Sequence, residues 1–298
     1  MTKLFISRSN IGSLLVMLSA ILYGIMPAMA KGIYADGCNS LTLTLLRSLL
    51  PLPALFVLAR REQPNLRLPK GSFLFVIVSA CFHSFTTLLL YSSYNHIPTG
   101  MATTLHYVYP LVVAFLSALF LHLKLDVWKK IGLFLGMLGV SFFALGNISS
   151  NLYGIVHALL SGCTFGSYMV MLGTRRIKQI PCHVYNWYLA LVTIILAGSL
   201  GLATHQLTLE LPAGAWMRAL IFSLLLTIGA NILLQLGIRM TTPSNAALLS
   251  LLEPITSVII GLLFLGDAFS ATKAAGCIII LISLLLTTVG EKLIKPRN

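Results

Sequence analysis

The residues best placed to do chemistry are the few ionisable side chains inside long apolar stretches. Of the seven acidic residues, all but Glu253 fall between these stretches or at their ends. Glu253 lies near the middle of one, where a charge costs about 2.5–3.5 kcal/mol. Pro254 follows it and interrupts the helical hydrogen bonds. Glu253 is therefore a candidate proton carrier or ligand of a substrate ammonium. The alternative is a mostly protonated structural residue that bonds the broken backbone or a neighbour such as Asn231.

Polar and aromatic side chains recur at helical spacing within the apolar stretches. His83, Thr87 and Tyr91 share a helix face because they are four residues apart. Such side chains face a bundle interior or a wet cavity, and the histidines could shuttle protons or could simply pack. We predict a substrate cavity lined by Tyr23, His83, Thr87, Tyr91, His106, Tyr109, His157, Phe165, Asn231, Gln235 and Ser250, with helix breaks at Pro110 and Pro254.

Arg47 is the other charge near the centre of an apolar stretch. Arginine keeps its proton, so it must find hydrogen-bond acceptors. We favour a structural interpretation, in which the long side chain reaches the membrane interface or bonds helix-end carbonyls. The alternative is an anchor for the carboxylate of an amino-acid-like substrate.

No residue pattern in the sequence points to catalysis, a metal or a cofactor. The five cysteines lack metal-binding spacing, and the sequence has no His-x-x-His cluster and no pair of intramembrane carboxylates. It also lacks the glycine-rich loop of an ATPase. We expect no cofactor, no metal and no enzyme; an enzyme acting on lipid-linked substrates is a less favoured alternative.

The elements that must position these residues are ten apolar segments. Hydrophobic residues make up 57% of the 298 residues and charged residues 9%, which is too few to cover a soluble surface. A helical membrane crossing needs about 20 apolar residues. Stretches of this kind run over 11–30, 40–59, 72–91, 98–121, 127–146, 152–173, 184–203, 216–237, 243–264 and 270–290. We predict an all-α integral membrane protein with ten transmembrane helices around a central cavity, and we interpret 11–30 as a membrane helix rather than a cleaved signal peptide.

The ten segments form two similar sets of five. Aligning the sets pairs Pro110 with Pro254 and Gly132 with Gly276. Because five is odd, the second set must enter the membrane inverted, and inverted repeats are typical of carriers that alternate access around a central site. We therefore predict one membrane domain made of a first repeat, residues 1–148, and an inverted second repeat, residues 149–298.

The distribution of positive charge predicts the orientation. Most Lys and Arg residues fall in loops on one side, and the other side holds only Lys31, Arg218 and Lys273. The positive-inside rule then places both termini in the cytoplasm. The net charge of +13 is spread over loops beside lipid headgroups, so it calls for a lipid bilayer and not a nucleic acid as partner. The sequence is compatible with a monomer and leaves the oligomeric state open.

The ninth and tenth segments carry a familiar motif. Leu252, Glu253 and Pro254, followed by the run from Gly261 to Asp267, resemble the second-half signature of EamA-like carriers in the drug/metabolite transporter superfamily. That signature usually ends in Glu where this chain has Asp267. The first-half counterpart keeps the proline but lacks the acid. The resemblance implies a carrier of the bacterial inner membrane, often an exporter of amino acids, related metabolites or toxic small molecules, with substrate held between the two halves.

We therefore expect a secondary transporter for a small organic molecule, acting in export and coupled to protons by Glu253 or a cavity histidine. An uncoupled facilitator or exchanger is the alternative within the same class. A channel is disfavoured because no filter-like loop or ring of charge is visible, and electrical recording would distinguish it from a carrier.

Overall fold

The computed structural model describes residues 8–123, 126–142, 151–264 and 270–294, and within them helix is the only regular secondary structure. The first part of the chain forms α1 (Arg8–Ala35), α2 (Ser40–Leu49), α3 (Leu52–Glu62), α4 (Phe73–Ser93), α5 (Thr99–His106), α6 (Tyr109–Leu121) and α7 (Val127–Ser141). The second part forms α8 (Leu152–Leu172), α9 (Arg175–Lys178), α10 (Cys182–Thr204), α11 (Ala213–Leu224), the π-helical η1 (Leu225–Ala230), α12 (Asn231–Met240), α13 (Pro243–Leu249), α14 (Leu252–Phe264) and α15 (Ala271–Ile294).

Several of these helices begin at polar residues that cap them. Asn39 accepts a hydrogen bond from the Thr42 backbone N–H at the start of α2, and Asn151 accepts one from Gly154 at the start of α8. Such caps satisfy N–H groups that a helix leaves free at its first turn. These capped ends lie between apolar stretches, so hydropathy and capping define the same helix limits.

Eight of the predicted crossings are present as helices long and apolar enough to span a membrane. In four of them, consecutive elements such as α2 with α3 or α13 with α14 together make one span. The remaining two predicted crossings correspond to α7 and α15. Within the described side chains α15 is apolar over residues 271–286, and α7 stops before residues 143–150, which lie outside the described part of the chain. The predicted count of ten is thus confirmed for eight.

Prolines divide two of the crossings at matching positions. α5 ends at His106, four residues before Pro110, and α13 gives way to α14 around Ser250, four residues before Pro254. A proline lacks an N–H and its ring displaces the carbonyl four residues earlier. Both crossings are therefore interrupted where a proline removes helical hydrogen bonds, and each break places irregular backbone within an apolar span.

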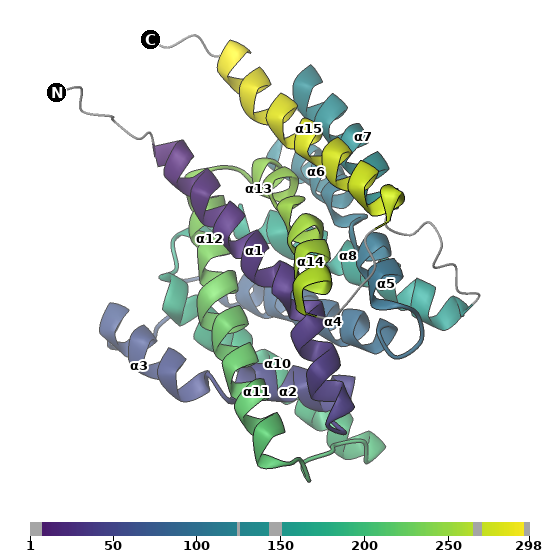
Figure 1. Ribbon diagram of the computed structural model, residues 1–298. Helices are drawn as coiled ribbons and strands as arrows, with labels where there is room; N and C mark the ends of the chain where they lie inside the picture. The colour runs from purple at the N-terminus through teal and green to yellow at the C-terminus, as the bar shows by residue number, and fades with distance from the viewer. Residues whose placement is uncertain (1–7, 124–125, 143–150, 265–269, 295–298) are drawn as a thin grey trace, which may run out of the picture.

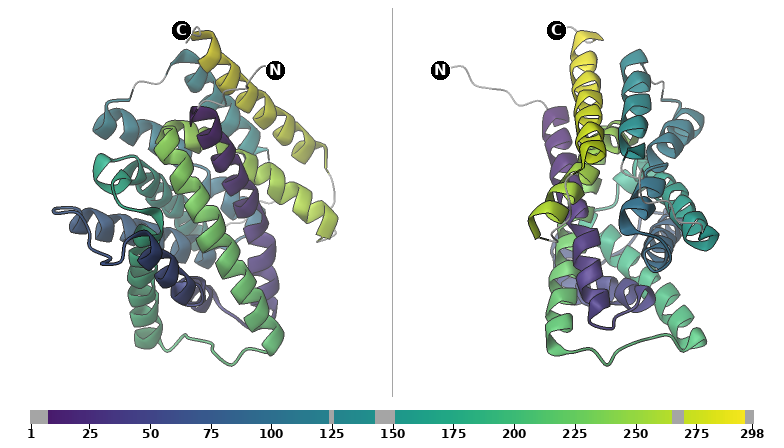
Figure 2. Two further views of the ribbon diagram at one scale, coloured as in Figure 1. Left: turned by 90° about the vertical axis from the view of Figure 1, so that its left-hand side faces the viewer. Right: turned by 45° about the vertical axis from the view of Figure 1, so that its right-hand side comes forward.

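The first helix of each part packs mainly against helices of the other part. α1 contacts η1, α12 and α14, while α8 contacts α4, α5 and α6. α7 and α15 lie side by side in every view, and α2 packs on α10 (Figure 1; Figure 2). The start of α1 and the end of α15 lie at the same end of the molecule.

Two glycines allow the close approach between α1 and α14 and between α8 and α6. A methyl group on Gly24 would lie 2.6 Å from the Glu253 carbonyl oxygen, and one on Gly166 would lie 3.1 Å from the Tyr109 carbonyl oxygen. Gly24 pairs with Gly166, and Tyr109 with Glu253, in the alignment of the two segment sets. The same close contact is therefore made twice, each time between helices from different parts of the chain.

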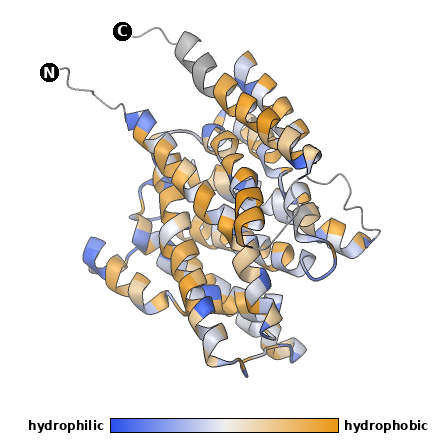
Figure 3. Ribbon diagram, viewed as in Figure 1, coloured by the Kyte–Doolittle hydropathy of each residue, from blue (hydrophilic) through white to orange (hydrophobic). Residues whose placement is uncertain are grey.

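The outer surface of the bundle is apolar. Phe115, Phe134, Leu202, Leu263 and Phe264 are each more than half exposed. Figure 3 shows hydrophobic residues along the lengths of the helices and hydrophilic residues at ends such as the first turn of α1 and the last turn of α3. This surface suits contact with lipid tails, and polar groups are left to the interior and the helix ends.

Candidate functional site

A small cavity lies at the centre of the bundle. About 30 Å³ of it is open to the centres of water-sized molecules, which is room for about two waters. Six crossings line it, including the one that contains α2, and the lining residues are Tyr23, Met26, Arg47, His83, Thr86, Thr87, Leu90, Tyr91, His106, Phe165 and Glu253. The cavity thus joins hydroxyl, imidazole, guanidinium and carboxyl groups within an aromatic and apolar wall.

Arg47 is held inside the bundle. Its side chain is 4% exposed, and its Nη1 donates to the Tyr91 hydroxyl at 3.0 Å. The Nε atom is buried without a hydrogen-bond partner. Our preferred interpretation from sequence was therefore wrong: the guanidinium does not reach the membrane interface, and it bonds a tyrosine rather than helix-end carbonyls. The carbonyls near Arg47 are taken by hydroxyls of the neighbouring crossing, from Ser223 to Leu46 and from Thr227 to Arg47 itself.

Glu253 enters the cavity from the first turn of α14, beside the helix break. It is 8% exposed, and within the described residues it forms no ion pair. The predicted structural partner Asn231 does not contact it, because the Asn231 side chain accepts from the Tyr23 hydroxyl and faces His83 Nε2 at 3.4 Å. Glu253 is consequently a buried acid that faces the cavity.

The two cavity histidines have different neighbours. His106 Nδ1 lies 2.8 Å from the Ser161 hydroxyl, so one of its ring nitrogens has a partner. His83 has Asn231 at Nε2, but its Nδ1 is buried without a partner. Since a neutral imidazole has one donor and one acceptor nitrogen, His83 retains an unused hydrogen-bonding position at the cavity.

Aromatic rings form the wall next to Glu253. The Phe165 ring centroid lies 4.9 Å from that of Tyr109 and 5.4 Å from that of His106. Tyr23 meets Phe165 edge-on at 6.4 Å. The hydroxyls of Tyr107 and Tyr109 are buried, and both lie near the Glu253 carboxyl group. This side of the cavity is therefore an aromatic wall backed by two buried tyrosine hydroxyls.

A polar network lies beside the cavity, where the Tyr168 ring packs on His83 and Phe165 of the lining. Gln235 and Asn186 exchange two hydrogen bonds of 2.8 and 3.1 Å, and Gln235 also donates to the Tyr168 hydroxyl at 3.2 Å. We refer to Tyr168, Asn186 and Gln235 as the Gln235 network. All three are buried, and their mutual bonds satisfy amides that would be costly if left unpaired.

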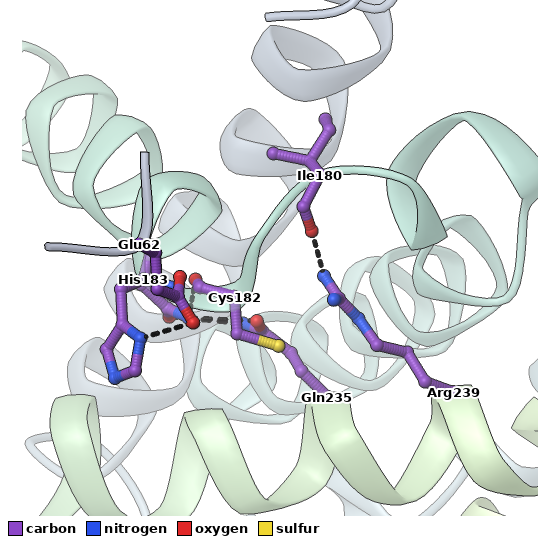
Figure 4. Close-up of polar contacts among 7 residues, drawn as sticks. Glu62, Ile180, Cys182, His183, Gln235 and Arg239 are labelled. Atoms are coloured by element: carbon purple, nitrogen blue, oxygen red, sulfur yellow. Dashed lines mark hydrogen bonds and ion pairs between the residues drawn. The ribbon is translucent and has the colours of Figure 1, made fainter. Parts of the chain in front are cut away.

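Contacts beyond the Gln235 network tie together the ends of α3, α10 and α12 (Figure 4). The Glu62 carboxylate accepts from the His183 backbone N–H at 2.9 Å and lies 2.8 Å from His183 Nδ1. Arg239, on the same face of α12 as Gln235, donates to the Ile180 carbonyl. Together these contacts hold the loop before α10 against its neighbours.

The structure brings some of the predicted site residues together and places others elsewhere. Tyr23, His83, Thr87, Tyr91, His106, Phe165 and Glu253 line the cavity. Tyr109 and Asn231 lie directly behind it, bonded or packed to lining residues.

The other predicted site residues lie outside the cavity. Gln235 belongs to the network described above, and Ser250 lies at the end of α13, where its carbonyl accepts from the Glu253 N–H. His157 bonds Ser92 and packs on Tyr153, away from the lining set. Their substrate-binding roles remain predictions.

Sequence reasoning missed Met26, Thr86 and Leu90, and it left Arg47 out of the cavity. Thr86 could have been found, since it adjoins the stripe from His83 to Tyr91. Met26 and Leu90 carry no signal that separates them from lipid-facing residues. The π-helical turn η1, whose Ala230 carbonyl accepts from Ser19 at 2.8 Å, was also not predicted. Such turns are frequent at functional sites.

Comparison with known proteins identifies the family. The sequence profile of the EamA-like transporter family matches residues 10–145 and again 152–289. The chain belongs to this family. The resemblance drawn from Glu253, Pro254 and the run after them is therefore confirmed, although Asp267 itself lies outside the described residues.

Relatives with full-length similarity have matching names. The EamA-like chain is 24% identical over 275 residues to an uncharacterized transporter of Archaeoglobus fulgidus, covering 92% of this chain and 95% of that one. It is 23% identical over 285 residues to the uncharacterized transporter YcbK of Bacillus subtilis, with 91% of each chain covered. A crystal structure shares the fold at 18% identity, with a TM-score of 0.76 over 95% of this chain and 98% of the other. The protein is thus a multi-pass membrane transporter.

Proposed function

We propose that this EamA-like protein is a secondary transporter that exports small organic metabolites, such as amino acids, across the bacterial inner membrane by alternating access. The observation that carries the proposal is the small central cavity, which buried charged groups face from both parts of the chain. Carriers of the inverted-repeat type bind substrate near mid-membrane, between the repeats and beside broken helices. The breaks before Pro110 and Pro254 adjoin this cavity.

Two inverted five-helix repeats, residues 1–148 and 149–298, are part of the proposal. Three observations support it: the matched helix breaks, the reciprocal packing of α1 and α8, and the equivalent contacts of Gly24 and Gly166. Two halves that are related in this way can exchange conformations, and the exchange would open the cavity to opposite sides in turn.

The orientation predicted from the basic loops places the Gln235 network on the cytoplasmic side. Tyr168 lies near the end of α8, just before the basic α9, and Asn186 lies near the start of α10. Under this assignment, the network and the Glu62, His183 and Arg239 contacts close the cytoplasmic access route. This conformation would receive protons from outside, as proton-driven export requires.

Glu253 is the proposed coupling residue, with His83 or His106 as a second candidate. A buried carboxyl group in a membrane can change its protonation as access alternates, because its surroundings change from wet to dry. An uncoupled exchanger is the alternative, and it needs no titrating group.

Reconstitution into liposomes tests the proposal. Purified protein would be exposed to a mixed pool of amino acids and common metabolites under proton gradients of either polarity, and the accumulated compounds would be identified by mass spectrometry. Accumulation driven by an inside-acidic gradient and abolished by a protonophore would support proton-coupled export. Glu253→Gln should then lose the gradient-driven component while retaining exchange of labelled substrate.

Accumulation that survives the protonophore would support the uncoupled exchanger and assign Glu253 another role. If nothing accumulates while a control carrier works in the same vesicles, transport of these compounds is excluded. Single-channel currents would contradict the carrier mechanism itself.

A further inference from the structure

A dense group of positive charges surrounds the loop between α3 and α4. Exposed basic side chains lie in the last turn of α3, in this loop and in α9, namely Arg60, Arg61, Arg67, Lys70, Arg175 and Arg176. We refer to these residues as the basic surface. The one acid within these segments is Glu62, whose carboxylate is already engaged by His183. Among the described residues, no member of the basic surface forms an ion pair, so its charge is available to an anionic partner from outside the protein.

Hydrogen bonds fix the parts of the basic surface against one another. Arg176 of α9 donates from Nη1 to the Gly71 carbonyl at 3.2 Å, and Tyr188 of α10 donates to the Leu66 carbonyl at 2.9 Å. Both acceptors are main-chain groups of the loop, so the loop is held against α9 and α10. Since an arginine has five N–H donors, Arg176 keeps most of its donors for a further partner. The positive charges are therefore presented on an ordered surface.

Exposed apolar side chains adjoin the basic surface on α3 and α4. Phe56 and Val57 of α3 are 43% and 50% exposed, and Phe73 and Leu74 in the first turn of α4 are 62% and 67% exposed. Figure 3 shows the boundary on α3, where a hydrophilic last turn follows hydrophobic turns. Positive charge beside a lipid-facing apolar surface is typical of the level where headgroups meet acyl chains. A ligand that fits both parts must be amphipathic.

Two of the arginines lie over aromatic rings at this boundary. The Arg60 guanidinium carbon is 5.9 Å from the centroid of the Phe56 ring, and that of Arg176 is 4.4 Å from the centroid of the Phe75 ring. The Phe56 ring in turn packs on Trp187 of α10, with centroids 6.1 Å apart. Ring contacts of this kind restrain a guanidinium group. Less side-chain freedom is then lost when the group binds a phosphate.

We infer that the basic surface is a binding site for anionic phospholipids, with their phosphates at Arg60 and Arg176 and their acyl chains along Phe56 and Phe73. An arginine matches two phosphate oxygens with parallel N–H donors. A zwitterionic headgroup also brings a cation to a surface whose single acid is engaged elsewhere, so the site selects against it. The inference is independent of the proposed transport function, because it concerns the outer surface and not the cavity. The orientation predicted from the basic loops places the site in the cytoplasmic leaflet.

Competition between lipids that differ only in their headgroups tests the site. The purified full-length protein in detergent would receive dioleoylphosphatidylglycerol and dioleoylphosphatidylcholine in equal amounts, and native mass spectrometry would count the bound molecules of each. Each basic residue near a headgroup strengthens the binding of an anionic lipid by a factor of about five. We therefore expect phosphatidylglycerol to be retained about tenfold or more over phosphatidylcholine. Equal retention of the two lipids would overturn the inference.

Two sets of substitutions locate the site. Arg60→Gln combined with Arg176→Gln removes the guanidinium groups that lie over the rings and should abolish most of the preference. Arg61→Gln, Arg67→Gln and Lys70→Gln together leave the ring contacts in place, so this variant should keep the wild-type melting temperature and still show a reduced preference. If both sets retain the wild-type lipid ratio, the basic surface does not hold the lipid.

A charge-matched variant separates a site from general electrostatic attraction. Arg8→Gln, Lys129→Gln and Lys130→Gln together remove basic residues from α1 and α7, as many as the second set removes. This variant should keep the wild-type lipid ratio, and a loss equal to that of the second set would contradict a localised site. Glycerophosphoglycerol, which is the same headgroup without acyl chains, should fail to displace the lipid at equal concentration. Displacement would assign the basic surface to free phosphodiesters instead.

Discussion

Single residues decide how the cavity is charged, and their burial was only partly predictable. Glu253 could be singled out because it is the one acid within an apolar stretch. Arg47 could not be placed, since a long side chain can reach the interface from many positions along a helix. The rotation of α2 and the presence of Tyr91 within 3.0 Å direct it inward instead. Contacts with other crossings therefore set the position of this charge.

The hydroxyl of Tyr91 should matter through Arg47. Tyr91→Phe removes the acceptor at Nη1 and leaves the guanidinium free to turn. A hydrogen bond to a charged group is worth about 1.5–3 kcal/mol, so we expect substrate binding to weaken about tenfold or more. Titration of the transported substrate would measure this.

Tyr188→Phe is the matched control. Its hydroxyl donates to the Leu66 carbonyl, outside the cavity lining. If Tyr91→Phe binds substrate as tightly as Tyr188→Phe, the Tyr91 contact does not orient Arg47 for binding.

At the scale of helices, the close approach of neighbouring helices determines how stably they pack. α1 and α14 meet at Gly24, where a methyl group would lie 2.6 Å from a backbone carbonyl. Gly24→Ala should lower stability by about 1–3 kcal/mol, because the helices must separate to accept the added carbon. Thermal unfolding of the purified protein would show this as a lower melting temperature.

Gly32→Ala serves as the control within the same helix. Nothing lies within 4 Å of the added methyl group there, and alanine favours helix over glycine. It should unfold at the same temperature as the wild type or higher. Equal melting of the two variants would show that α1 and α14 adjust freely.

The Gln235 network should control access to the cavity from one side. Gln235→Ala removes three hydrogen bonds and leaves Asn186 partly unsatisfied. We expect a cysteine introduced in place of Thr87 to react faster with a membrane-impermeant thiol reagent added from the cytoplasmic side. Inside-out vesicles would provide this measurement.

Gln206→Ala changes an exposed glutamine at the other end of the bundle and should leave the labelling rate unchanged. Faster labelling from the periplasmic side in Gln235→Ala would reverse the orientation that we assign to the network.

The positions of the helices along the sequence were largely predictable, but the contacts between helices were not. Hydropathy located the helices because membrane depth fixes the length of each crossing. Hydropathy could not show which helix faces meet. A polar face such as that of His83, Thr87 and Tyr91 fixes how its helix is turned only when the neighbouring helices are known. Gln235 shows the difference: it lies on a polar stripe, yet its partners Asn186 and Tyr168 form a separate network.

The orientation in the membrane is a testable property of the whole chain. A fluorescent protein that matures only in the cytoplasm should fluoresce when it is fused after Asn298 or before Met1, because the basic loops predict both termini inside. Dark fusions at both ends, with membrane insertion verified, would invert the topology and exchange the sides assigned to the cavity.

The reciprocal packing of α1 and α8 has a consequence for biosynthesis. α1 leaves the ribosome long before its neighbours η1, α12 and α14, which lie in the second part of the chain. During most of translation, α1 must therefore remain in the bilayer with lipid or an insertion factor covering the face that later packs on α12. A chain released after the first half would expose that face permanently, which makes it a natural substrate for membrane quality control.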